Sequence, residues 1–143
     1  MSGRIQEQVG FLLIQVMRGH RGRAAALLGQ FGVHVGQEMV LAALWDEDGL
    51  SQSALAEQNG VEPPTMTRMI DRMARADLVR RERDTGDARV SRVFLTERGQ
   101  RLREPVQAAW RTLEREAFFG FTLEERIIIR RLLLQMRANL ADG

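Results

Sequence analysis

The stretch EPPTMTRMIDRMARADLVRRERDTGDARVSR, from Glu62 to Arg92, decides the fold predicted for this chain. In its first half, apolar side chains recur at i, i+3, i+4 and i+7 from Met66 onward, which leaves threonines and arginines on the opposite face of a helix. Strand character follows over Val79–Arg83 and again over Val90–Leu95, on either side of a turn. We therefore predict a short helix followed directly by an antiparallel β-ribbon.

This helix and ribbon have the chemistry expected of a DNA-binding unit. A helix with threonine and arginine on its polar face fits the major groove, and a ribbon with an arginine at its tip fits the neighbouring minor groove. Residues 62–103 hold eleven arginines against seven acidic residues, whereas residues 31–61 hold five acidic residues and no arginine. A basic block beside an acidic one favours a nucleic-acid partner, although a solvated charged face would give the same counts.

The residues before this unit complete a helix-turn-helix. A helix is predicted from Gln37 to Trp45, with Met39 among the residues facing inward. Ser51 or Ser53 can cap the next helix, and Gly60 can end it in a left-handed conformation. The prolines of the quoted stretch then open the following helix, where a missing backbone N–H costs nothing.

The outer segments are predicted to be helices that a second subunit covers. An apolar stripe at helical spacing runs from Ile5 to Leu28, and the glycines inside it should weaken or bend that helix. After the ribbon, a helix capped by Thr96 should bend or break at Pro105. The last helix begins at a capping box of Thr122 and Glu125 and is apolar on more than one side, which predicts burial by more than its own monomer.

Length and composition restrict the class of protein. With 143 residues, of which 44% are hydrophobic and 28% charged, the chain can bury a core as one domain. No apolar run reaches the roughly 20 residues of a membrane span, and the polar start does not have the pattern of a signal peptide. There are no cysteines, which excludes disulfides, zinc fingers and thiol-based redox sensing. We expect a cytoplasmic protein without a membrane partner.

Nothing in the sequence indicates catalysis. Histidine, carboxylate and serine residues are not spaced as a catalytic set, and no glycine-rich phosphate loop is visible. With two histidines and no cysteine, a transition-metal site would need carboxylates alone. We predict no catalytic residue, no metal site, no cofactor and no enzymatic activity.

From the quoted stretch outward, the chain resembles the MarR family of bacterial winged helix-turn-helix regulators. The resemblance covers most of the chain and is densest from Leu50 to Gly99. The matching segments are Leu55-Ala56, Pro64-Thr65-Met66-Thr67-Arg68, Arg83-Asp84-Thr85-Gly86-Asp87-Ala88-Arg89, Leu95-Thr96 and Gly99. The resemblance implies a mainly α fold with a small β-wing, that is, a winged helix-turn-helix domain with N- and C-terminal dimerisation helices.

The resemblance also implies an assembly and a partner. Residues 1–143 would form a single domain, with residues 1–34 and 105–143 as the helical dimerisation region and residues 35–104 as the DNA-binding lobe. The homodimer would present two recognition helices and two wings to a pseudo-palindromic operator in double-stranded DNA. Arg89 would enter the minor groove, with Asp87 placed to orient its guanidinium. The DNA-binding residues implied by position are Ser53, Pro64, Thr65, Thr67, Arg68, Arg72, Asp87 and Arg89.

Near the implied DNA face, two positions depart from the family pattern and a third has two alternative roles. Asp77 stands where the family usually has a glycine that ends the recognition helix, and aspartate tolerates a left-handed conformation better than most residues. Glu62 stands where a serine commonly caps that helix, and a glutamate there would repel a nearby phosphate. Arg75 could contact DNA or could instead pair with Asp71 or Glu82.

A small-molecule effector is a further implication of the resemblance. Members of the family bind small aromatic acids and phenols between the dimer helices and the DNA-binding lobe. The local side chains that could pair with an anion or stack on a ring are Arg18, His20, His34 and Trp45. The histidines could equally be satisfied polar groups near the dimer interface.

Three functions remain open at this point. The first is a homodimeric repressor that a small aromatic or phenolic ligand releases from DNA. The second is a DNA-binding regulator without a ligand, acting as an activator or an architectural factor. The third is a helical dimerisation or scaffold module without DNA binding. A steep salt dependence of DNA binding would separate the first two from the third.

Overall fold

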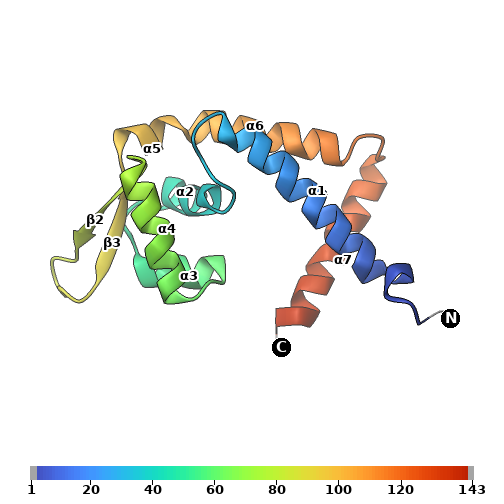
Figure 1. Ribbon diagram of the computed structural model, residues 1–143, viewed down its shortest axis with the longest axis horizontal. Coiled ribbons are helices and arrows are strands. Elements are labelled where there is room, and N and C mark those ends of the chain that lie inside the picture. Colours follow the sequence, from blue (N-terminus) through green and yellow to red (C-terminus); the bar gives the residue numbers. More distant parts are fainter. Residues whose placement is uncertain (1–2, 142–143) are drawn as a thin grey trace.

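The computed structural model describes residues 3–141, in which the elements follow the predicted order (Figure 1). The four terminal residues of the predicted domain lie outside this part of the chain. No helix within residues 3–141 is both long and apolar enough to cross a membrane. The helices are η1 Ile5–Glu7, α1 Val9–Gly29, α2 Gln37–Asp46, α3 Gln52–Asn59, α4 Pro63–Arg75, α5 Glu97–Arg101, α6 Arg103–Ala117 and α7 Leu123–Ala141. The strands are β1 Leu50–Ser51, β2 Val79–Arg83 and β3 Ser91–Leu95.

The three strands form one antiparallel sheet in the order β1-β3-β2, which confirms the mainly α fold with a small β-wing. In the ribbon, Val79 lies opposite Leu95 and Arg83 lies opposite Ser91. Strand β3 begins one residue later than the predicted Val90, because the Val90 N–H donates to the Asp87 carbonyl inside the turn, at 3.0 Å.

The helix-turn-helix forms for the local reasons that the sequence indicates. Ser51, rather than Ser53, caps α3, since its hydroxyl accepts a hydrogen bond from the Ala54 N–H at 3.1 Å. Gly60 ends α3 in the left-handed region at φ 63°, and Asp77 adopts the same region at φ 60° after α4. Asp77 therefore takes the conformation for which glycine is usual, as predicted.

The packing of α2 and α4 fixes which face of each helix meets the core. Met66, Ile70 and Met73 of α4 are fully buried, as their helical spacing predicts. The prediction for Met39 of α2 was wrong, because this side chain is exposed and Leu41 lies in the core instead.

The predicted interruption near Pro105 lies at Leu102, where α5 ends and α6 begins. Pro105 has no N–H to donate to the carbonyl of Arg101 four residues earlier, so the series of backbone hydrogen bonds cannot continue from α5 into α6 without a break. Thr96 caps α5 by accepting from the Gly99 N–H at 3.1 Å. The capping box of Thr122 and Glu125 also forms, with both reciprocal hydrogen bonds present.

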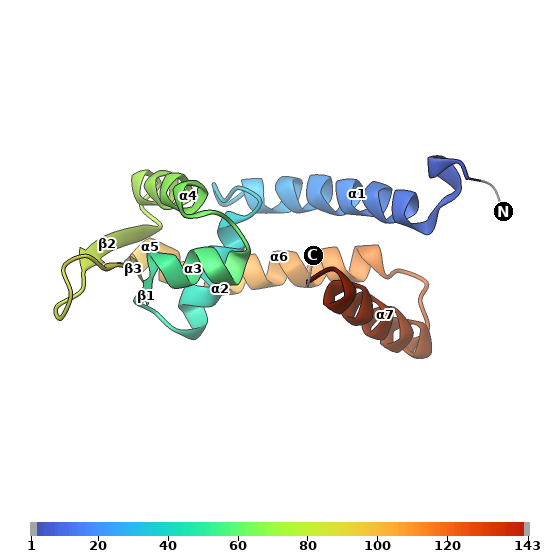
Figure 2. The ribbon, with the colours of Figure 1, turned by 90° about the horizontal axis from the view of Figure 1, so that it is seen from below.

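One core joins the winged helix-turn-helix to the outer helices. Buried residues of α1 (Ala24, Leu27 and Leu28) and of α6 (Val106, Ala109 and Leu113) belong to the same cluster as the core of the lobe. Helices α1 and α6 run side by side, and α1 continues unbroken through its glycines (Figures 1 and 2).

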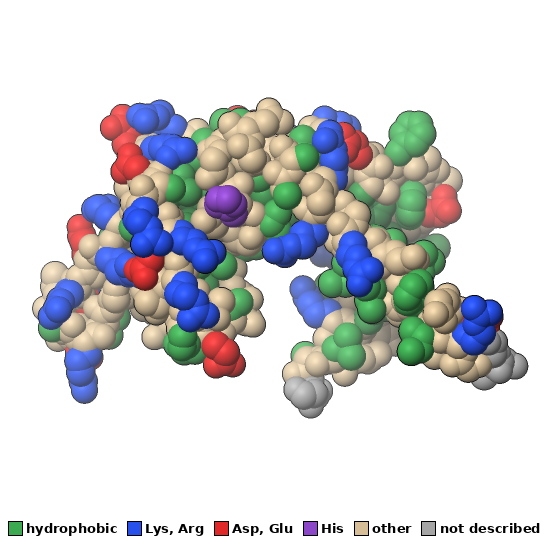
Figure 3. All heavy atoms as spheres, in the orientation of Figure 1, with side chains coloured by type: hydrophobic (Ala, Val, Ile, Leu, Met, Phe, Trp, Pro, Cys, Tyr) green, Lys and Arg blue, Asp and Glu red, His purple; other side chains and the backbone are tan. Residues whose placement is uncertain are grey.

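The remainder of α1 and all of α7 leave apolar side chains uncovered. Helix α7 extends from the end of α6 and has no buried residue among those the structure describes (Figure 2). Val9 exposes 78% of its surface and Ile127 exposes 61%. Figure 3 shows such hydrophobic side chains over α1 and α7 on the face it presents.

Candidate nucleic-acid interface

The face of α4 that points away from the core carries the predicted major-groove residues. Because Met66, Ile70 and Met73 fix the rotation of the helix, Arg68 and Arg72 are held in solvent on the opposite side. Pro64 is also exposed, and Thr65 is half-buried. Figure 3 shows arginine side chains gathered over α4 and the wing. This surface presents guanidinium groups from rigid elements, which is the chemistry that binds phosphates and guanine edges.

Thr67 and Ser53 lie beside this face in different environments. The Thr67 hydroxyl accepts a hydrogen bond from Gln52 Nε2 at 2.6 Å and donates one to the Pro63 carbonyl at 3.1 Å. Most of its hydrogen-bonding capacity is therefore used within the protein. Ser53, for which the resemblance implies a phosphate contact, is exposed near the start of α3. Its hydroxyl is free of the capping role that Ser51 takes.

The wing tip holds Arg89 in a defined orientation. Asp87 Oδ1 accepts from the Arg89 Nε at 3.1 Å and from its backbone N–H at 3.0 Å, and Oδ2 accepts from Nη2 at 3.2 Å. The hydrogen bond from the guanidinium lowers the pKa of Asp87 below its ordinary value. The Arg89 side chain is nevertheless 91% exposed, so it is oriented without being covered.

Asp84 fixes the turn behind that tip. Its Oδ2 accepts from the backbone N–H groups of Gly86 at 3.0 Å and Asp87 at 2.9 Å, and its Oδ1 accepts from the Arg92 Nε at 2.5 Å. The hydrogen bond from Arg92, followed by those from the two backbone groups, lowers the pKa of Asp84. Arg92 also donates to the Gly49 carbonyl at 3.0 Å, which ties the wing to the loop before β1. An aspartate two residues before glycine is a sequence signal for such a turn.

Arg81 is a component of the interface that sequence reasoning missed. It donates from Nη1 to Asp71 Oδ1 at 2.6 Å and so joins β2 to α4. The alternative in which Arg75 pairs with Asp71 or Glu82 is not found within residues 3–141, where Asp71 pairs with Arg81 and Glu82 pairs with Arg80 at 3.2 Å. No local pattern indicates a contact between positions ten residues apart on a helix and a strand.

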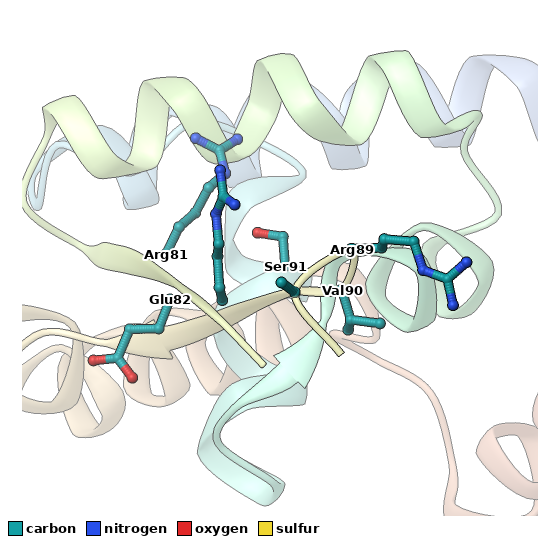
Figure 4. Close-up of a pocket in the computed structure, with 7 residues that line it drawn as sticks. Arg81, Glu82, Arg89, Val90 and Ser91 are labelled. Atoms are coloured by element: carbon teal, nitrogen blue, oxygen red, sulfur yellow. The ribbon is translucent and has the colours of Figure 1, made fainter. Parts of the chain in front are cut away.

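A hollow of about 490 Å³ lies on the ribbon itself (Figure 4). In Figure 4, Arg81 points from β2 toward α4, Arg89 extends away from the ribbon, and Glu82 points to the opposite side. The residues that line it are Arg81, Glu82, Arg83, Ala88, Arg89, Val90 and Ser91. The wing therefore presents three arginines around one shallow depression.

A second cavity, of about 630 Å³, lies between α1, the loop before α2, and α4. Arg21, His34, Arg68 and Arg72 surround it together with apolar groups such as Met69, which suits an anion with a ring. The remaining lining residues are Ala25, Val35, Gln37 and Thr65. Two arginines of the α4 face are thus shared between this cavity and the predicted DNA surface.

Of the four ligand residues predicted from the sequence, the structure places His34 on this cavity and the other three elsewhere. The His20 ring lies 5.5 Å from the Trp110 ring, centroid to centroid, and Arg18 is exposed on α1. Trp45 donates from Nε1 to the Gly99 carbonyl at 3.0 Å. Arg21, one helical turn after Arg18, lines the cavity and is not among the predicted ligand residues.

Comparisons with known proteins find relatives of this chain. The model of the MarR family matches residues 35–91. The chain is 33% identical over 122 residues to the HTH-type transcriptional regulator TtmR of Methylorubrum extorquens strain PA1, an alignment that covers 85% of this chain and 60% of TtmR. It is 30% identical over 101 residues to the organic hydroperoxide resistance transcriptional regulator of Bacillus subtilis strain 168, covering 71% of this chain and 69% of that protein.

A solved structure with the same fold is that of BpsR from Bordetella bronchiseptica. The two superpose with a TM-score of 0.86 at 26% sequence identity, over 95% of this chain and 97% of that one. The BpsR structure concerns regulation of its DNA binding by 6-hydroxynicotinic acid.

Proposed function

The chain belongs to the MarR family of winged helix-turn-helix transcriptional regulators, and we propose that it binds a pseudo-palindromic operator in double-stranded DNA as a homodimer. One observation carries this proposal. Arg89 projects from the wing tip, oriented by Asp87 yet 91% exposed, while Arg68 and Arg72 are exposed on the helix that precedes the wing. A helix in the major groove and an arginine in the adjacent minor groove need this combination.

In this proposal the polar groups divide between base edges and phosphates. Thr65, Arg68 and Arg72 would meet the major groove from α4, with Pro64 at the start of the helix beside the backbone. Ser53 would contact a phosphate from α3. Thr67 would approach DNA through its methyl group, because Gln52 and Pro63 already engage its hydroxyl.

The homodimer would form through residues 1–34 and 105–143, on either side of the DNA-binding lobe. The exposed apolar side chains of these segments support this assignment, because a soluble monomer rarely leaves so many uncovered on one pair of helices. They are Val9, Leu12, Val16, Met17, Ile127, Ile128, Leu132 and Leu133. A second copy would cover them and hold two wings apart.

We further propose a repressor that a small aromatic acid or phenolic ligand releases from its operator. The cavity bounded by Arg21, His34, Arg68 and Arg72 supports an anionic ring compound as the effector. An acid held there would engage Arg68 and Arg72, so these guanidinium groups could not meet DNA at the same time. Regulation of BpsR by 6-hydroxynicotinic acid is consistent with this chemistry in a similar protein. The proposal assigns the protein no catalytic role.

The test is equilibrium binding to the DNA upstream of the protein's own gene and to an unrelated duplex, over a series of salt concentrations. We expect tighter binding to the upstream DNA and a log affinity that falls by about 0.9 per phosphate contact as log salt rises. Equal and weak binding to both duplexes would contradict the proposed function. Specific binding that no aromatic acid or phenol alters would favour a regulator without a ligand.

A further inference from the structure

We propose that Arg81 is a positioning residue, which fixes recognition helix α4 relative to the wing so that the two reach adjacent grooves together. The inference rests on the proposed DNA binding and adds to it a residue that makes no DNA contact. It follows from the position of one guanidinium between three elements of the lobe.

The Arg81 guanidinium bridges β2, α3 and α4. It donates from Nη1 to Asp71 Oδ1 at 2.6 Å, from Nη2 to the Thr67 carbonyl at 3.0 Å and from Nε to Gln52 Oε1 at 3.1 Å. A planar fork with three such bonds fixes orientation as well as distance. Among the hydrogen bonds within residues 3–141, those of Arg81 are the ones that join β2 to both α3 and α4.

Gln52 and Thr67 extend this bridge into a network. Gln52 receives the Arg81 Nε–H on its oxygen and donates from its nitrogen to the Thr67 hydroxyl at 2.6 Å. Thr67 in turn donates to the Pro63 carbonyl at 3.1 Å, at the start of α4. The first turns of the recognition helix are therefore tied to the wing strand by polar contacts on the side that faces DNA in the proposed complex.

The same contacts argue against a phosphate-binding role for Arg81. Its side chain is 31% exposed, against 91% for Arg89, and the Asp71 carboxylate already compensates its charge. A move to reach a phosphate would break three hydrogen bonds within the protein. Phosphate and base contacts both depend on the register that such a bridge maintains.

Substitution of Asp71 tests the inference, because the two roles that Asp71 could have predict opposite changes in affinity for DNA. Removing a carboxylate from a DNA-facing surface should tighten binding through simple electrostatics. If Asp71 instead holds Arg81 in place, the same change should weaken binding to the preferred sequence. Glu82 is the matched control, because it lies next to Arg81 on β2, points to the other side of the ribbon and pairs with Arg80.

The experiment uses the full chain and a duplex selected from a random pool by the native protein. Affinity for this duplex and for an unselected one is measured over a salt series for Asp71→Ala, Arg81→Ala, the double variant and Glu82→Ala. We expect each single variant of the pair to lower the ratio of the two affinities by about tenfold, and the double variant to lower it no further. The salt slope should stay unchanged, and Glu82→Ala should keep the native ratio.

Several outcomes would overturn the inference. Tighter binding of the selected duplex by Asp71→Ala would show that Asp71 acts only as a negative charge that repels DNA. A salt slope smaller by about 0.9 in Arg81→Ala, with the affinity ratio unchanged, would make Arg81 a phosphate contact. If Arg81→Ala fails to fold, Arg81→Lys keeps the charge without the fork and should still lower the ratio. A native protein that selects no sequence would contradict the proposed function itself, whereas a native preference that Asp71→Ala retains would contradict only the bridge.

Discussion

Asp87 binds the Arg89 guanidinium at two points, with Nε donating to Oδ1 at 3.1 Å and Nη2 donating to Oδ2 at 3.2 Å. The pair lies within one turn and leaves the outer edge of the guanidinium open to solvent. An arginine held in this way has lost much of its rotamer freedom before DNA arrives, so less entropy is lost on binding. The arrangement favours a role in which Arg89 inserts into a minor groove over one in which it acts only as a diffuse surface charge.

Replacing Arg89 should therefore weaken operator binding more than its single charge would suggest. For Arg89→Ala we expect a loss of about 1–3 kcal/mol in binding free energy, measured by titration of a labelled operator. Arg101→Ala is the control, because Arg101 has the same charge but pairs with Glu97 on α5, away from the wing tip. Equal effects of the two substitutions would show that Arg89 acts only through net charge.

The wing turn should depend on pH through Asp84. The pKa of Asp84 is lower in the folded state than in the unfolded chain. Its contribution to stability is therefore present in full above the pKa of the unfolded chain, and it is lost as the pH falls through the pKa of the folded state. The turn should thus be intact at about pH 5 and should loosen only below about pH 4. Amide resonances of Gly86 and Asp87 report this change, with Val93 in the central strand as a control for global unfolding. In Asp84→Asn, loosening that is already present at neutral pH is expected, and a native-like turn there would assign the turn to other groups.

Much of the fold could be predicted because its signals are local. The serine cap of α3, the left-handed Gly60 and Asp77, and the break before Pro105 each depend on a few consecutive residues, although the choice of Ser51 over Ser53 came from the structure. The spacing of apolar residues in α4 likewise fixes its buried face without knowledge of the partner elements. The pattern fails at Met39, because which apolar side chain of a short helix is covered depends on tertiary packing.

The candidate site was only partly predictable for the same reason. Asp87 and Arg89 are two residues apart in one turn, and the family resemblance implies their pairing. The bidentate ion pair of Arg23 and Glu116, at 2.6 and 2.9 Å, joins α1 to α6 across 93 positions of the sequence. Such contacts and the cavity beside Arg21 exist only once the helices are docked.

Arg68 should determine base preference rather than overall affinity for DNA. If it makes a bidentate contact with a base edge, Arg68→Ala should lose about 1–3 kcal/mol on the preferred sequence and relax specificity at one position. Binding to a library of single-base operator variants measures this. A uniform loss over all variants, with a smaller salt slope, would instead place Arg68 on a phosphate.

A charge placed in the exposed apolar face of α7 should separate the proposed dimer. Leu132→Glu puts a carboxylate where a second copy would bury a leucine, and the cost of desolvating it disfavours association. Sedimentation analysis should show a dimer for the native protein and a shift to monomer for the variant, with operator binding lost in parallel. Arg130→Glu, at a charged position of the same helix, should remain dimeric. A native protein that sediments as a monomer would contradict the assembly.

The effector site can be tested by comparing two arginines three residues apart on α1. Arg21 lines the cavity of about 630 Å³ whereas Arg18 does not, so an aromatic carboxylate should pair with Arg21. A ligand at 100 times its Kd stabilises the native state by about 2.7 kcal/mol, which should raise the Tm by roughly 5–10 °C while operator binding weakens. Both effects require the ligand to bind the DNA-free form more tightly than the DNA-bound form.

Arg21→Ala should abolish the rise in Tm and the release from the operator, and it should leave operator affinity without ligand close to the native value. Arg18→Ala should keep both responses, since its side chain lies outside the cavity. A loss of response in Arg18→Ala alone would move the effector to the region where His20 of α1 meets Trp110 of α6. If a panel of aromatic acids and phenols changes neither Tm nor DNA binding in the native protein, the cavity arginines serve DNA binding only, and the protein regulates without a ligand of this class.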